Sequence, residues 1–178
     1  GGAGTYYFDE LNFVAAGGGG GGTVAGLPID FDTAGVTYTL TGFGGAEDAT
    51  VVAGVAGANG SVARVVKSAT AELWAGTTVS TGANQSIATI PFTATARSMT
   101  LRVRAPAAGI VVRLKVEDAA DNTHTVETEA TTTVANAWET LTFNFANQAT
   151  GTAALNLAFT HNKASVFFAF GTTGAAGG

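Results

Sequence analysis

Charged residues recur at alternate positions in several segments whose composition is typical of β-strands. Because successive side chains of a strand point to opposite faces, residues with this spacing share one face of a sheet. The residues concerned are Arg102, Arg104, Arg113, Lys115, Glu117, Glu127, Glu129 and Glu139. Two kinds of chemistry fit them: ion pairs between neighbouring strands, which contribute about 0.2–1 kcal/mol each, or a polar face that hydrogen-bonds sugar hydroxyls.

The second interpretation needs a flat ring on which a sugar can stack, and the chain has two tryptophans. The candidate carbohydrate-binding residues are Trp74, Trp138, Arg102, Arg104, Lys115 and Glu127. Both tryptophans also have apolar neighbours in the sequence, which favours packing in the core for each ring.

Residues for covalent or redox chemistry are scarce. The chain has no Cys, and its two histidines, His124 and His161, follow the pattern of solvated turn residues. We find no Ser-His-Asp elbow, HExxH pair or phosphate-binding loop. Among 13 acidic residues, a chance pair of carboxylates has little weight as a glycosidase site. The sequence therefore predicts that the protein is not an enzyme.

The charge of the chain bears on its partners. Lys and Arg number 8 against 13 Asp and Glu, a net charge of −5. This balance gives no basic footprint for nucleic acid or for an anionic membrane. Apolar runs stay far below the roughly 20 residues that cross a bilayer, so we expect neither a nucleic-acid partner nor membrane insertion.

The elements that must position these residues are β-strands. Apolar and polar residues alternate most clearly at 109–117, where Val112 and Leu114 face one side and Arg113 and Lys115 the other. Strands are predicted at 5–14, 27–32, 36–42, 49–53, 61–67, 71–80, 87–93, 97–104, 109–117, 124–134, 137–146, 153–160 and 163–170. The pattern predicts an all-β fold, a two-sheet antiparallel β-sandwich of jelly-roll type.

The first strand is set apart from the rest. Six glycines at 17–22 read as part of a linker at 17–26, which divides an N-terminal strand segment, 1–16, from a sandwich body, 27–178. An isolated strand cannot bury its apolar side chains, so 5–14 must pair with a sheet beside 27–32 or 163–170, in its own chain or in a neighbouring copy. The candidate pairing residues are Tyr6, Tyr7, Phe8, Leu11 and Phe13.

Short motifs along the chain resemble a known group of modules. The motifs are LPIDFD at 27–32, YTLTGFGG at 38–45, LKVE at 114–117, WETLTF at 138–143 and FFAFG at 167–171. In this order they resemble the non-catalytic jelly-roll modules, similar to carbohydrate-binding modules, of secreted bacterial laminarinase-type glycoside hydrolases and surface proteins. In those modules a strand like YYFDEL closes the C-terminus, whereas here it stands at 6–11. The resemblance thus implies a closing strand moved to the N-terminus.

The resemblance also implies a metal site and a location. Related modules often hold a structural Ca²⁺ between their first and last strands, and carboxylate oxygens suit this ion. Asp9 and Asp32, with Asp30 beside them, stand where the ligands would be expected. Outward-facing acids at strand ends are the alternative. The expected location is extracellular or at the cell surface.

Two functions fit this sequence, and the scarcity of spare aromatic side chains favours the first. One is a structural module in which strand 5–14 completes the sheet of the next copy, so that copies assemble head-to-tail into a fibre or tandem array. The other is a self-complemented, monomeric carbohydrate-binding module that targets a polysaccharide. The expected partners are accordingly other copies of the chain or a polysaccharide.

Overall fold

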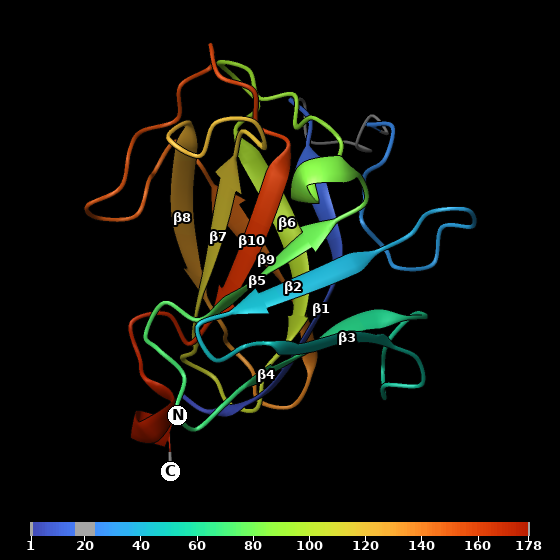
Figure 1. Cartoon of the computed structure of the whole chain (residues 1–178), viewed down its shortest axis with the longest axis vertical. Coiled ribbons are helices and arrows are strands. Elements are labelled where there is room, and N and C mark those ends of the chain that lie inside the picture. The colour runs from blue at the N-terminus through green and yellow to red at the C-terminus, as the bar shows by residue number, and fades with distance from the viewer. Residues whose placement is uncertain (1, 17–23, 178) are drawn as a thin grey trace.

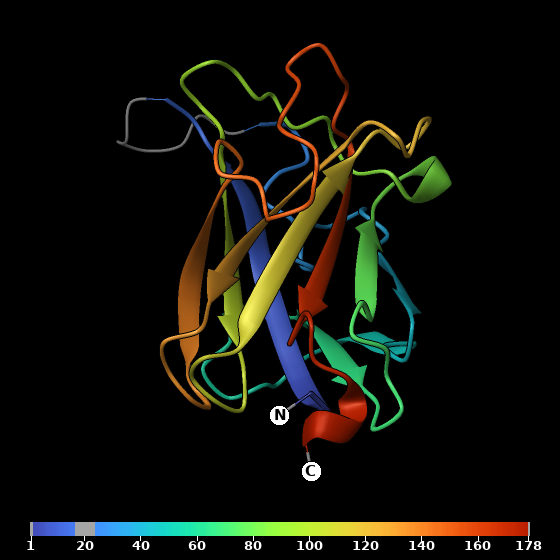
Figure 2. The ribbon, with the colours of Figure 1, turned by 90° about the vertical axis from the view of Figure 1, so that its left-hand side faces the viewer.

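The computed structural model describes residues 2–16 and 24–177, which form two antiparallel sheets packed face to face (Figures 1 and 2). The strands are β1 (Gly4–Val14), β2 (Thr39–Phe43), β3 (Asp48–Val52), β4 (Val62–Lys67), β5 (Gly76–Ser80), β6 (Ser98–Arg104), β7 (Val111–Glu117), β8 (Thr125–Thr131), β9 (Trp138–Asn144) and β10 (Lys163–Phe168). Short 3₁₀ turns, η1 (Ala83–Gln85) and η2 (Gly174–Gly177), complete the described elements.

Each sheet has five strands. The β1 sheet has the order β3-β4-β1-β6-β9, and the β10 sheet has the order β2-β5-β10-β7-β8. The predicted all-β sandwich is therefore confirmed. Within the described residues, no helix is long and apolar enough to cross a membrane.

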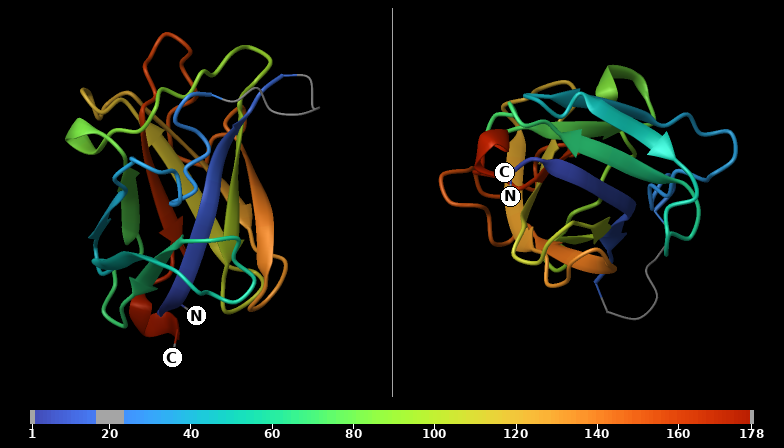
Figure 3. Two further views of the ribbon diagram at one scale, coloured as in Figure 1. Left: turned by 90° about the vertical axis from the view of Figure 1, so that its right-hand side faces the viewer. Right: turned by 90° about the horizontal axis from the view of Figure 1, so that it is seen from below.

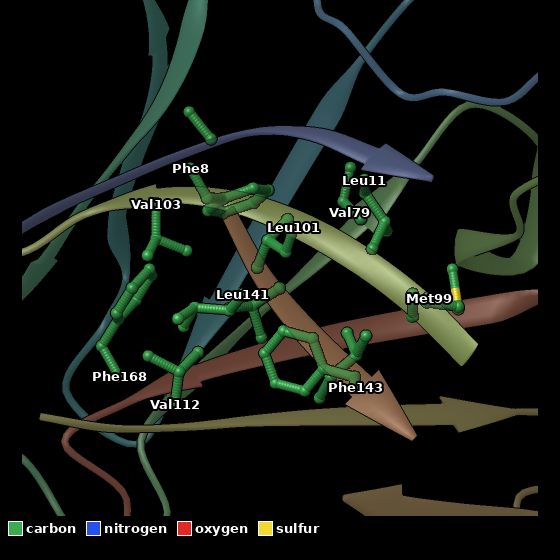
Figure 4. Packing of buried hydrophobic residues seen from close by; sticks show 14 of the residues in the cluster. Phe8, Leu11, Val79, Met99, Leu101, Val103, Val112, Leu141, Phe143 and Phe168 are labelled. Carbon is green, nitrogen blue, oxygen red and sulfur yellow. The ribbon is translucent and has the colours of Figure 1, made fainter. Parts of the chain in front are cut away.

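The core lies between the two sheets (Figure 4). Phe8, Leu101 and Phe143 enter it from the β1 sheet, and Val112 and Phe168 enter it from the β10 sheet. The alternation predicted at 109–117 is observed through Val116, because Val112, Leu114 and Val116 are fully buried while the residues between them are partly exposed; Glu117, at the end of β7, is buried as well. This pattern leaves the other face of each sheet for polar and aromatic side chains.

Strand β1 is the central strand of its sheet. It pairs with β4 on one side and with β6 on the other, so its main chain is hydrogen-bonded along both edges. The prediction that 5–14 is a paired strand is confirmed. Of the two neighbours predicted for it, 163–170 was wrong, and 27–32 pairs with it at one position only. Strand β10 lies in the opposite sheet, where the ring of Phe168 stacks on Tyr6 across the core at 4.7 Å. Segment 27–32 contributes a single bridge, from Ile29 to Leu11.

Three of the predicted strands, 27–32, 87–93 and 153–160, are irregular segments in the structure. Pro28 and Pro91 lack the N–H that a ladder requires. Asp30 closes a local turn by accepting hydrogen bonds from the main-chain N–H groups of Asp32 and Thr33, both at 3.1 Å. Asn156 similarly accepts from the N–H of Ala158. Side chains that bond to their own main chain favour turns over strands.

The two ends of the described chain lie side by side (Figure 3). Gly2 packs directly against the main-chain carbonyl of Thr173. The buried ammonium of Lys67 anchors the C-terminal turn, donating to the carbonyl oxygens of Phe168, Ala169 and Thr172 at 3.2, 2.8 and 2.7 Å. The predicted linker at 17–26 lies mostly outside the described residues, which resume at 24.

Candidate functional site

The outer face of the β10 sheet is hollowed into a groove of about 590 Å³. The register of the five strands places one residue from each strand in a row along the floor of the groove. Thr41, Thr78, Ser165, Lys115 and Glu127 are successive cross-strand partners, one from each strand of the sheet. The Thr78 and Ser165 hydroxyls lie 2.7 Å apart in the middle of this row. The row therefore runs from hydroxyl groups to charged groups across the sheet.

Aromatic side chains line one part of the groove. The ring of Phe43 stacks on Trp74, with centroids 6.2 Å apart and planes at 18°, and meets Phe167 edge-on at 5.6 Å. Phe170 contacts Phe167 in the same manner at 5.8 Å. Gly76 makes room for this cluster, because a Cβ there would lie 2.6 Å from the Phe167 ring.

Trp74 is 49% exposed, so the prediction that it packs in the core was wrong. Segment 71–75 is a turn rather than the first half of a strand, and Glu72 fixes it by donating its main-chain N–H to the carbonyl of Gly44 at 2.8 Å. The turn holds the Trp74 ring at the rim, over Gly44, where a Cβ would lie 2.8 Å from the ring. A flat apolar surface thus faces solvent beside the groove.

The opposite part of the groove is charged. The Arg113 guanidinium contacts carboxylate oxygens of Glu127 at 2.8 Å and of Glu129 at 2.6 Å, and lies 3.5 Å from the centroid of the Phe170 ring. Lys115 Nζ lies 2.9 Å from one oxygen of Glu117, and Lys163 Nζ lies 3.9 Å from the other. These contacts fix long side chains in place, and each cation of the groove has a carboxylate partner.

This arrangement can bind a polyhydroxylated ligand. The exposed indole ring offers an apolar platform, and the charged row offers hydrogen-bond donors and acceptors within the same groove. The Glu117 side chain is 7% exposed and Glu127 is 18% exposed, so both are held largely out of solvent by their neighbours. Such restrained groups lose little conformational freedom when a ligand binds.

The structure divides the charged residues that the spacing had placed on one face. Arg113, Lys115, Glu117, Glu127 and Glu129 lie on the β10 sheet, in β7 and β8. The others, Arg102, Arg104 and Glu139, lie in β6 and β9 of the β1 sheet. The prediction of one shared face was therefore wrong, because strand alternation says which side chains point outward but not to which sheet a strand belongs. Of the candidate carbohydrate-binding residues, Trp74, Lys115 and Glu127 come together in the groove.

Trp138 lies on the outer face of the β1 sheet and not in the core, a second correction. Its indole N–H donates to the carbonyl of Ala56 at 3.0 Å. The Arg102 guanidinium stacks on the ring at 4.5 Å, and Tyr7 lies beside it at 6.4 Å. Arg104 pairs with Trp138 in the strand register and lies over the Tyr7 ring at 5.7 Å. Because these contacts cover much of the indole, Trp138 offers less free surface than Trp74.

The three acids predicted as calcium ligands have different surroundings. Asp9 is 2% exposed, and its burial raises the pKa of its carboxyl group to about 6. The negative charges of Glu10 and Asp32 act in the same direction. The hydrogen bond from the Glu10 N–H and the charge of Arg102 act in the opposite direction but are outweighed. Asp32 accepts from the main-chain N–H of Ser61 at 3.0 Å. The described residues contain no group of three or more His, Cys, Asp or Glu side chains placed to hold a metal ion.

Asp30 accepts hydrogen bonds from residues close to it in the chain. Its carboxylate accepts hydrogen bonds from the Tyr38 hydroxyl at 2.8 Å and from the Thr33 hydroxyl at 2.9 Å. Burial opposes ionisation, but hydrogen bonds from Tyr38, Asp32 and Thr33 outweigh it and lower the pKa of Asp30. Calcium binding at Asp9 and Asp32 stays a prediction.

The two histidines differ. His124 is partly exposed in a turn and stacks on Phe159 at 3.7 Å. His161 is 2% exposed, so the prediction that it is a solvated turn residue was wrong. Its ring meets Phe92 edge-on at 5.5 Å, and burial lowers its pKa.

The sequence reasoning missed Phe43, Phe167, Phe170 and Lys163 as groove residues. One signal was available for Phe167. Phe167 and Phe168 are consecutive in a strand, and because neighbours in a strand face opposite sides, one of the two rings must lie on the outer face.

Comparisons of this chain with protein-family models, with curated proteins and with solved structures give no match. The resemblance to carbohydrate-binding modules accordingly stays a prediction based on short motifs.

Proposed function

We propose that this protein is a non-catalytic extracellular module that binds a polysaccharide in the groove of the β10 sheet. The observation that carries the proposal is the exposed ring of Trp74 at the rim of a groove with a row of fixed hydroxyl and charged groups. Ligand sites combine an apolar surface with a few convergent polar groups in this way.

Each part of the groove has a role in this proposal. The Trp74 ring packs against the C–H face of a sugar, which removes apolar surface from water. Glu127 accepts hydrogen bonds from sugar hydroxyls, and Lys115 donates to sugar oxygens. The stack on Phe43 orients the indole before the sugar arrives. Strand backbones hold the polar row, so the site needs little rearrangement on binding.

Affinity gel electrophoresis with soluble polysaccharides tests the proposal. We expect Trp74→Ala to weaken binding at least tenfold, since the platform is lost while an exposed position tolerates the change. Trp138→Ala is the matched control, because it removes the other tryptophan from the opposite sheet. Thermal melts check that both variants fold. Loss of binding in Trp138→Ala with none in Trp74→Ala would contradict the proposed site.

Structural assembly is a second candidate function, and the position of β1 supports it. This strand lies at one end of the chain yet occupies the centre of its sheet, between β4 and β6. A β1 strand from another copy would fill the same slot with the same hydrogen bonds. Pairing within one chain competes with it, because self-pairing loses no translational freedom.

A further inference from the structure

Glu117 joins two cations of the groove. It is the cross-strand partner of Lys163 and lies two residues from Lys115 on the same face of β7. One carboxylate oxygen lies 2.9 Å from the Lys115 ammonium, and the other lies 3.9 Å from the Lys163 ammonium. Its side chain is 7% exposed, against 24% for Lys115 and 20% for Lys163. The Glu117 side chain is therefore less accessible than those of the two lysines, and all three residues line the groove.

The charges of the groove cancel. Lys115 and Lys163 share Glu117, and Arg113 is held between Glu127 and Glu129. A sugar carboxylate entering the groove would have to compete with Glu117 for both lysines and would meet its negative charge at close range. An uncharged sugar faces no such competition, because hydroxyls can bond to an ion pair without separating it.

We propose that Glu117 is the specificity-determining residue of the groove and that it excludes acidic glycans in favour of uncharged ones. The proposal rests on the proposed polysaccharide-binding function and adds the ligand class to it. The contact of one buried carboxylate with two lysines, in a groove whose charges cancel as a whole, is the feature that carries it. If Glu117 is replaced by its amide, both ammonium groups are free to pair with a uronate carboxylate.

The test compares Glu117→Gln with the wild type against laminarin, a neutral glucan, and polygalacturonate, an acidic glycan. We expect the wild type to bind the glucan and to bind polygalacturonate weakly. Glu117→Gln should bind polygalacturonate at least tenfold more tightly, while its affinity for the glucan changes less than about threefold. The gain should shrink as salt is raised, because exposed charge pairs are screened.

Asp48→Asn is the matched control. It also removes one carboxylate of an ion pair, the contact with Arg64 at 3.1 Å, but on the β1 sheet. It therefore makes the same change in net charge without altering the groove, and no gain is expected. Addition of Lys163→Ala to Glu117→Gln should reverse the gain. If Glu117→Gln does not fold, the more exposed Glu127→Gln provides a smaller gain by the same reasoning, since Arg113 keeps Glu129.

The outcomes separate the two proposals. If the wild type binds the glucan and neither Gln variant gains affinity for polygalacturonate, the role of Glu117 is wrong and the polysaccharide function stands. A wild type that prefers polygalacturonate also overturns the role of Glu117. If the wild type binds neither glycan but Glu117→Gln binds polygalacturonate, the charge argument is supported and the proposed function fails.

Discussion

Asp9 is an acid held out of water on the outer face of a central strand. Its neighbours are Asp32, which disfavours ionisation, and the Arg102 guanidinium, which favours it but approaches no closer than 3.8 Å. Burial dominates, and the pKa rises from 3.8 to about 6. Because the folded state holds this proton more tightly than the unfolded state, Asp9 stabilises the fold fully below about pH 3.8 and loses that contribution as the pH rises through about 6.

We expect Asp9→Asn to remove this pH dependence. The wild type should lose about 2–3 kcal/mol of unfolding free energy, relative to the variant, between pH 4 and pH 7. Denaturant titrations at several pH values measure the difference between the two proteins. The buried His161 has a lowered pKa and acts in the opposite sense, since its stabilising contribution is lost as the pH falls below about 6.5, but it is common to both proteins and cancels in the difference.

The response to Ca²⁺ provides a second comparison of Asp9→Asn with the wild type. If Ca²⁺ binds at Asp9 and Asp32, it must displace the proton of Asp9, so added Ca²⁺ should raise the melting temperature of the wild type more at pH 7 than at pH 5. Asp9→Asn should lose this response. Equal melting curves with Ca²⁺ and with a chelator at pH 7 would contradict the predicted metal site.

At the scale of the elements, periodicity predicted which segments form strands better than how they are paired. The strand at 109–117 was clear because its apolar residues alternate without interruption. The segments 87–93 and 153–160 were misread, because short apolar stretches in loops resemble strands in sequence; 87–93 buries Ile87 and Ile90, whereas 153–160 is mostly exposed. The pairing of β1 with β4 and β6 could not be predicted, since main-chain hydrogen bonds carry no sequence signal.

Removal of β1 should prevent the rest of the chain from folding. Tyr6, Phe8, Leu11 and Phe13 are all at most 5% exposed, and each contributes about 2–5 kcal/mol to a core. Their sum reaches the whole stability of an ordinary domain, about 5–15 kcal/mol. A chain of residues 24–178 should therefore show no cooperative melting transition, and a peptide of residues 2–16 should restore it.

The same peptide carrying Phe8→Ala is the control and should restore the transition poorly. A body that melts cooperatively without any peptide would refute the role assigned to β1. Restoration in trans is also the step that strand donation between copies requires.

At the scale of the whole molecule, half of the residues that the sequence predicted to bind carbohydrate lie in the candidate site. Trp74, Lys115 and Glu127 were recognised by residue type, and the structure places them in one groove. Their grouping with Trp138, Arg102 and Arg104 failed because chain order does not reveal which sheet a strand joins. The contribution of Phe43 and Lys163 could not be predicted, since it depends on β2 and β10 lying in the same sheet as β7.

The adjacent ends of the chain predict that the connection between β1 and the body can be moved. Gly2 contacts Thr173, and Gly174 packs against the main-chain carbonyls of Ser68 and Ala69, so both ends lie at the same end of the sandwich (Figure 3). A circular permutant that runs from residue 24 to 178 and continues through 1–16 keeps every strand in place. We expect its melting temperature to lie within about 4 °C of the wild type, which corresponds to about 1 kcal/mol for a chain of this size.

The permutant also distinguishes pairing of β1 within its own chain from donation of β1 to another copy. Its β1 strand follows the C-terminal turn that Lys67 anchors, so the strand returns to its own body and the glycine run no longer connects them. If wild-type copies associate by donated strands, light scattering should show that association lost in the permutant. If β1 of the wild type pairs within its own chain, both proteins should be monomers at every concentration. If the permutant is unfolded while the wild type is folded, the expectation that β1 can be joined to the body through the adjacent ends is wrong.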